Sequence, residues 1–166
     1  LMADPRIVKN PKPMEKVTYK ELRELSYMGA SVLHEEAIFP TREAGIPINI
    51  KNTNAPEDPG TMILSDISPV SHTGTITGIA GKKDFTVISI EKTFMGSDRS
   101  FLRKLMTIME TNDISVEHMP SSIDSISLIV PASELSSKLN KVTEEIRIYC
   151  EPDSIICYPD MALVAV

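Results

Sequence analysis

The order of strands and helices between residues 85 and 158 is the strongest constraint that this sequence places on its fold. Alternating apolar residues indicate strands, whereas apolar residues recurring every three or four positions indicate helices. We expect Ser97 or Asp98 to cap the first helix, Asn112 to end it, and Ser133 to cap the second. The predicted elements are a strand, a helix, two strands, a helix and strand segments at 85–92, 98–112, 114–119, 124–130, 133–146, 147–150 and 154–158. This order predicts an α+β, ferredoxin-like βαββαβ unit with both helices on one face of an antiparallel sheet.

The first 64 residues predict a separate, smaller arrangement. Thr18 and Glu21 have the spacing of a capping box, with Val17 and Leu22 as the flanking hydrophobic staple, so a helix should begin there. A second helix, with Pro40 inside it, should end at Gly45. Strands are expected at 46–50 and 61–64, a linker at 65–74, a short strand at 75–80 and a turn at 81–84.

Composition excludes several classes of protein. The chain has 166 residues and a formal net charge of −6, and its basic residues are scattered, which argues against a surface for nucleic acid or anionic lipid. No apolar run approaches the roughly 20 residues of a membrane helix, so we expect a cytoplasmic protein. Cys150 and Cys157 fit neither a zinc knuckle nor a disulfide framework and are predicted to be core or half-buried thiols. The three histidines are not spaced as metal ligands, and no metal site is predicted.

Two local features could carry chemistry. Asp4 and Arg6 flank Pro5 in a rigid loop, but taken alone they are better explained by a surface turn with an exposed ion pair. The segment 93–100 connects a strand to a helix, where free amides favour an anionic group and Gly96 permits close approach of a ligand. A simple capped helix is the alternative interpretation of this segment.

Four stretches together resemble the end of the catalytic domain of the aspartokinases. They are Met2-Ala-Asp-Pro-Arg6, Gly29-Ala-Ser-Val-Leu-His34, Ala44-Gly-Ile-Pro-Ile48 and Lys51-Asn-Thr53. The resemblance implies a parent enzyme that transfers the γ-phosphoryl group of ATP to the side-chain carboxylate of aspartate with the help of Mg²⁺. It places Asp4, Arg6 and Ser31 at the nucleotide, with Ser31 standing where many members have lysine. The family's N-terminal kinase motif is absent, so we expect no kinase activity from this polypeptide alone, which is predicted to be part of a longer protein.

Residues from 75 onward resemble the regulatory region of the same family, which consists of ACT modules. The resemblance implies these segments: 1–64 kinase-domain remnant, 65–74 linker, 75–84 first strand of a second ACT module, 85–158 complete ACT module, and 159–166 truncated continuation of the second. The complete module is expected to bind an end-product amino acid, lysine or threonine, and to form a homodimer. A stand-alone, non-enzymatic ACT regulator is the alternative.

The same resemblance implies a set of effector-binding residues. The stretch 114–124 is similar to the effector-site strand and turn of the family, and the loop before the first helix of the module would lie opposite it. Three acids of the set, Asp98, Glu117 and Asp124, would meet a cationic side chain. The full set is Met95, Gly96, Ser97, Asp98, Ser100, Ser115, Val116, Glu117 and Asp124.

Overall fold

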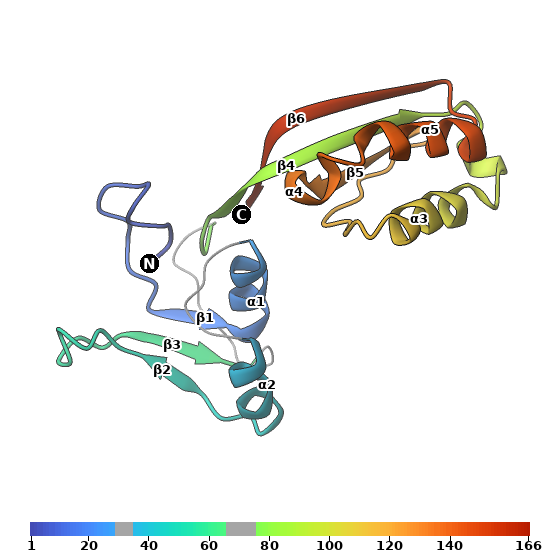
Figure 1. Ribbon diagram of the computed structural model, residues 1–166. Helices are drawn as coiled ribbons and strands as arrows, with labels where there is room; N and C mark the ends of the chain where they lie inside the picture. Colours follow the sequence, from blue (N-terminus) through green and yellow to red (C-terminus); the bar gives the residue numbers. More distant parts are fainter. Residues whose placement is uncertain (29–34, 66–75) are drawn as a thin grey trace. The chain divides into compact units, whose positions relative to one another are not determined.

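A computed structural model describes residues 1–28, 35–65 and 76–166 (Figure 1). The chain divides into two compact units, one formed by Leu1–Lys82 with Leu163–Val166 and the other by Lys83–Ala162. Each unit contains its own buried apolar cluster and takes part in its own three-stranded sheet. The architecture is therefore mixed α+β, as the sequence predicts.

The first unit is built on a small mixed sheet. Its elements are β1 (Lys16–Thr18), α1 (Tyr19–Tyr27), α2 (Glu35–Glu43), β2 (Ile48–Ile50) and β3 (Thr61–Leu64). The strand order is β1-β3-β2, in which β1 pairs parallel and β2 antiparallel with β3. Val17, Tyr19, Leu22, Ile38 and Ile63 form the core beneath the two helices. The sequence predicted both helices and the strands at β2 and β3.

The start of α1 confirms the predicted capping box. Thr18 Oγ1 accepts a hydrogen bond from the Glu21 amide at 3.2 Å, and Glu21 Oε2 accepts one from the Thr18 amide at 2.9 Å. The other Glu21 oxygen, Oε1, accepts a hydrogen bond from the Thr77 hydroxyl at 2.9 Å. Val17 and Leu22 are both buried in the same cluster, as a hydrophobic staple requires.

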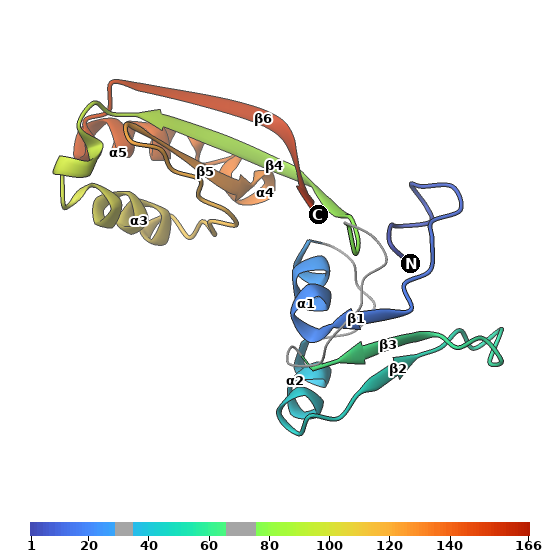
Figure 2. The ribbon, with the colours of Figure 1, turned by 180° about the vertical axis from the view of Figure 1, so that it is seen from behind.

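The second unit places its helices against one face of a sheet (Figures 1 and 2). The strand order is β5-β4-β6, and β4 and β5 are antiparallel with Phe85 opposite Pro131 and Glu91 opposite Ser125. One cluster buries residues from β4, β5, α3 and α5 together, including Ile88, Leu128, Leu105 and Ile146. The elements are β4 (Ala80–Glu91), a 3₁₀ turn (Met95–Ser97), α3 (Phe101–Thr111), β5 (Ser125–Pro131), α4 (Ala132–Leu135), α5 (Leu139–Cys150) and β6 (Ser154–Ala165).

Three predictions about strands were wrong. The short strand predicted at 75–80 is not formed in its described part, where only Ala80 is a strand residue and already belongs to β4. The predicted turn at 81–84 lies inside β4, which runs unbroken from Ala80 while Asp84 takes a positive φ of 70°. A single residue in this conformation lets a strand bend without ending it. The predicted strand at 114–119 is reduced to one bridge between His118 and Ile129, with the Glu117 amide donating to the Ile129 carbonyl at 2.9 Å.

The second predicted helix also differs in its limits. A short α4 precedes α5, so Ser133 lies within α4 and caps nothing, while Lys138 occupies the N-cap of α5. Residues 147–150 were predicted to be a strand, but they form the last turn of α5. Val142, Ile146 and Cys150 are all buried at intervals of four, which continues the helical face to its end.

Several predictions fall outside the described residues, and others stay untested. Most of the predicted linker at 65–74 lies in the range 66–75, which the structure does not describe. The assignment of 75–84 and 159–166 to a second module stays a prediction.

Both cysteines are free, with Cys150 buried and Cys157 half-buried, as expected. Burial raises the pKa of each thiol above its ordinary value.

Candidate functional site

The connection between β4 and α3 is anchored on the chain segment that precedes β5. The Lys92 amide donates to the Asp124 carbonyl at 2.9 Å, and the Phe94 amide donates to Asp124 Oδ1 at 2.9 Å. Phe94 has a left-handed backbone with φ of 59°, and its side chain is 76% exposed. Met95, one of the predicted site residues, turns into the core instead. Asp124 thus positions the loop through two amides and lies beside it.

Asp98 organises the start of α3 without being its N-cap. Its Oδ1 accepts hydrogen bonds from the Ser100 hydroxyl at 2.8 Å and the Ser100 amide at 3.1 Å. These two hydrogen bonds hold the pKa of the Asp98 carboxyl below its ordinary value, and the bond from the Ser100 hydroxyl contributes most. The helix begins at Phe101 with Ser100 in the N-cap position, so the predicted cap at Ser97 or Asp98 was placed too early. A short Asx-type turn takes up the difference.

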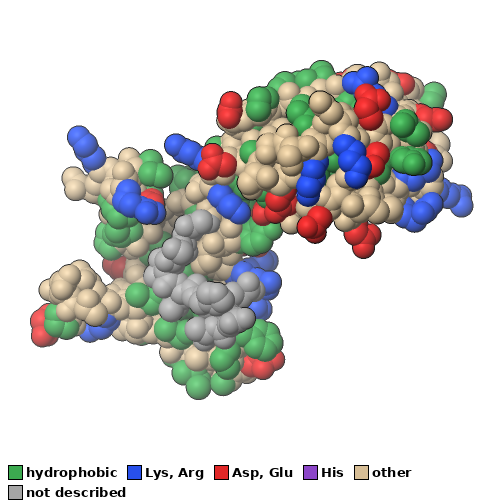
Figure 3. Space-filling view, viewed as in Figure 1, with side chains coloured by type: hydrophobic (Ala, Val, Ile, Leu, Met, Phe, Trp, Pro, Cys, Tyr) green, Lys and Arg blue, Asp and Glu red, His purple; other side chains and the backbone are tan. Residues whose placement is uncertain are grey.

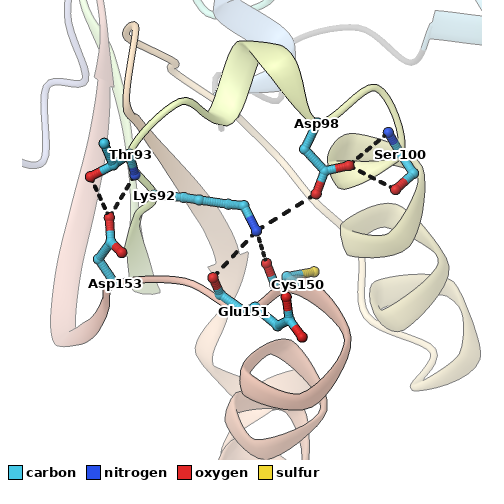
Figure 4. A network of polar contacts seen from close by, with 7 residues as sticks. All are labelled: Lys92, Thr93, Asp98, Ser100, Cys150, Glu151 and Asp153. Atoms are coloured by element: carbon cyan, nitrogen blue, oxygen red, sulfur yellow. Dashed lines mark hydrogen bonds and ion pairs between the residues drawn. The ribbon is translucent and has the colours of Figure 1, made fainter.

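Lys92 extends from the end of β4 into a cage of oxygen atoms (Figure 4). Its ammonium donates to the Cys150 carbonyl at 2.5 Å and the Glu151 carbonyl at 3.3 Å, both at the C-terminal end of α5. Asp98 Oδ2 lies 3.6 Å from the same nitrogen, and the Phe101 ring centroid lies 5.6 Å from it. Only 16% of the Lys92 side chain is exposed. The Asp98 carboxylate is therefore held by Ser100 on one oxygen and by Lys92 on the other.

Thr93, the residue after Lys92, is hydrogen-bonded to Asp153, the residue that precedes β6. Asp153 Oδ2 accepts hydrogen bonds from the Thr93 amide at 2.6 Å and the Thr93 hydroxyl at 2.7 Å (Figure 4). The hydroxyl, and then the amide, lowers the pKa of the Asp153 carboxyl. Lys92, Thr93, Asp124 and Asp153 line an open cleft of about 530 Å³, together with Glu91, Ser122, Ile123 and Ser125.

The structure brings together only part of the predicted effector set. The loop residues and Asp124 meet at the end of β4, whereas Glu117 lies beside Ile129, five positions beyond Asp124. Five residues of strand span about 17 Å. Ser115 and Val116 precede Glu117 in the chain. The Ser115 amide already donates to Glu134 Oε2 at 2.7 Å, and Val116 packs against the core. One copy of the unit therefore does not gather all nine residues around one point.

Sequence reasoning missed Lys92, Thr93 and Asp153. Lys92 and Thr93 contact partners that lie 58 to 60 positions away in the chain. The only local signal is that both follow a strand whose end lies beside the connection between the last helix and the last strand in a βαββαβ order.

The residues predicted at the nucleotide lie in the first unit. Arg6 donates to Asp4 through Nε at 3.1 Å to both carboxylate oxygens and through Nη2 at 2.7 Å to Oδ2. The Arg6 side chain, followed by its amide, holds the pKa of Asp4 low. The Arg6 side chain is 84% exposed, so its guanidinium is accessible to a phosphate. Ser31 lies outside the described residues.

Two other kinds of feature are absent from the described residues. Within 1–28, 35–65 and 76–166, no group of three or more His, Cys, Asp or Glu side chains could hold a metal ion. Over the same ranges, none of the helices combines the length and apolar character needed to cross a membrane. Acidic and basic side chains are interspersed over the face seen in Figure 3.

Comparisons with known proteins agree on one family. The profile of the amino acid kinase family matches residues 1–52. Aspartokinase 3 of Bacillus subtilis is 37% identical over 98% of this chain and 36% of its own length, and the chloroplastic aspartokinase 1 of Arabidopsis thaliana is 36% identical over 88% and 26%.

Solved structures extend this agreement to the fold. The crystal structure of Clostridium acetobutylicum aspartate kinase, described as an allosteric enzyme, is 62% identical with a TM-score of 0.89 over 99% of this chain and 38% of that one. Escherichia coli aspartokinase III in complex with lysine and aspartate shares the fold, with a TM-score of 0.72 at 23% identity over 98% of this chain and 36% of that one. The chain thus spans little more than a third of the length of these proteins. It belongs to the aspartokinase family.

Proposed function

We propose that these residues serve an aspartate kinase, which transfers the γ-phosphoryl group of ATP to the side-chain carboxylate of aspartate, and that the second unit binds an end-product amino acid that inhibits the enzyme. One observation carries the proposal: 62% identity over nearly the whole chain to an aspartate kinase described as allosteric. The fold shared with a lysine-bound aspartokinase supports lysine as the first effector to test, with threonine second.

The second unit is proposed to be an ACT module. The segment around His118 bridges to β5, β5 pairs with β4, and β4 neighbours β6, with α3 and α5 packed against the same apolar cluster. This arrangement supports the ferredoxin-like βαββαβ order, with the second strand reduced to a bridge. We further propose that two copies of the module pair, because one copy separates the loop residues from Glu117 and its neighbours.

The loop between β4 and α3 is proposed to hold the effector backbone. The start of α3 favours a carboxylate, because amides in the first helical turn have no intrahelical partners. The Ser100 and Phe101 amides already donate to Asp98, so the amides of Leu102 and Arg103 would meet the carboxylate. Asp98 is already paired with Lys92, so we propose that a cationic effector side chain approaches Asp124, whose donors are backbone amides.

In the catalytic half, Asp4, Arg6 and Ser31 are proposed to lie at the nucleotide. ATP with Mg²⁺ supplies the transferable phosphoryl group and the charge that neutralises it. Arg6 can contribute an exposed guanidinium to a phosphate, and Asp4 holds that guanidinium in place through the contacts above. No metal-binding group is present in the described ranges, so no metal ligand is assigned to these residues.

Three measurements test the proposed function. We expect calorimetric titration of the chain to show saturable binding of lysine or threonine, and sedimentation of the same samples to show a dimer. Asp124→Asn should weaken lysine binding, whereas Asp113→Asn, a matched change at another exposed acid, should not. The natural protein containing this chain should release ADP in a manner that depends on aspartate and is inhibited by the same amino acid, while the 166-residue chain alone should release none. Absence of both binding and feedback inhibition would contradict the regulatory role.

A further inference from the structure

Lys92 joins three elements of the second unit at one nitrogen atom. The ammonium contacts the two carbonyls at the end of α5 and the Asp98 carboxylate before α3 (Figure 4). It also lies over the ring of Phe101, the first residue of α3. An ammonium has three N–H donors, and here three oxygen atoms surround it. Lys92 is thus fully engaged within the protein.

The positive charge on Lys92 stabilises two groups, the last carbonyls of α5 and the Asp98 carboxylate. The last carbonyls of a helix carry the negative end of its dipole, which a cation stabilises. Glu151 closes α5 in a left-handed conformation, and its carbonyl also faces the ammonium. At the other end, Asp98 Oδ2 has the ammonium as its cationic partner, while Oδ1 supports the turn into α3 through Ser100. Loss of the ammonium would leave a half-buried carboxylate with only one oxygen held.

We infer that Lys92 is a positioning residue of the regulatory unit: its ammonium holds the Asp98–Ser100 turn against the C-terminal end of α5 and keeps the first turn of α3 in the arrangement that binds effector. The inference about binding rests on the proposed function, whereas the inference about the turn does not. Lys92 acts through Asp98, so its effect on binding should depend on the presence of the Asp98 carboxylate.

Hydrogen exchange tests the positioning of the turn without any effector. Lys92→Met removes the charge and keeps the length of the side chain, Lys92→Arg keeps the charge, and Lys141→Met removes a cation whose ion-pair partner is Glu145 within α5. The Ser100 amide donates to Asp98, so its exchange rate reports on the turn. We expect about tenfold faster exchange at Ser100 in Lys92→Met and near wild-type exchange in the other two. Wild-type exchange in Lys92→Met would overturn the inference.

A double-mutant cycle tests the link to binding. Calorimetric titration with lysine and with threonine should show binding weakened by about tenfold in Lys92→Met but by less than about threefold in Lys92→Arg. In an Asp98→Asn background, Lys92→Met should change the affinity by less than about threefold, while its effect on the melting temperature persists through the α5 carbonyls. An equal loss of affinity in both backgrounds would show a merely structural role. If the wild-type chain binds neither amino acid while exchange behaves as expected, the proposed function fails and the positioning of the turn stands.

Discussion

Replacement of Leu105 by alanine tests how the second unit is held together. Leu105 has no exposed surface and lies in the cluster that joins α3 to α5 and the sheet. Leucine-to-alanine changes at such sites cost about 2–5 kcal/mol, as the sum of lost transfer free energy and residual cavity. We expect a loss of about 3 kcal/mol in the free energy of unfolding. For a unit of this size that loss lowers Tm by about 12–24 °C.

The same helix offers a matched control. Leu102 lies three residues earlier on α3 and is 48% exposed, so Leu102→Ala should cost less than about 1 kcal/mol. Urea unfolding followed by far-UV circular dichroism measures both variants, since the chain contains no tryptophan. The slope of the transition should be unchanged. Equal losses for the two leucines would refute the assignment of the buried face of α3 and, with it, the packing that positions the effector loop.

Three further experiments test other parts of the chain. Thr18→Ala should destabilise the first unit by about 1 kcal/mol, because it removes the capping hydroxyl, whereas Thr18→Ser should not; thermal unfolding distinguishes them. Asp153 has a pKa below its ordinary value of 3.8, so its stabilising contribution is present above that pH and is lost as pH falls below it; Asp153→Asn should flatten the acid limb of a stability–pH curve. Cys157 should react with a disulfide reagent before the buried Cys150, and the reverse order would contradict their assigned burial.

The sequence predicted those parts of the fold whose signals are local. The capping box at Thr18, the end of α3 at Asn112 and the strand at β5 depend on residues within a few positions of one another. The errors occur where distant contacts decide the outcome. Residues 114–119 alternate like a strand but form only one bridge with β5, and the residues predicted as a turn at 81–84 belong to the continuous strand β4. Local propensity does not reveal how far pairing extends.

The candidate site shows the same limit in its chemistry. Residue type and a family resemblance singled out Asp98 as an acid for a cationic ligand, but neither could show that Lys92 already pairs with it. That pairing arises because β4 ends beside the C-terminus of α5, a consequence of topology and not of spacing in the chain.

The pairing of Asp98 changes how effector charge should be recognised. A carboxylate already compensated by an ammonium offers an incoming cation much less than an uncompensated one does, because the two cations repel each other and share one acceptor. Asp124 differs, since the groups that donate to it are backbone amides and the described contacts include no cation. Discrimination between lysine and threonine should therefore depend on Asp124 directly, whereas Asp98 influences both effectors alike through the turn that it holds with Ser100. Equal losses of lysine and threonine affinity in Asp98→Asn, beside a loss selective for lysine in Asp124→Asn, would separate these two roles.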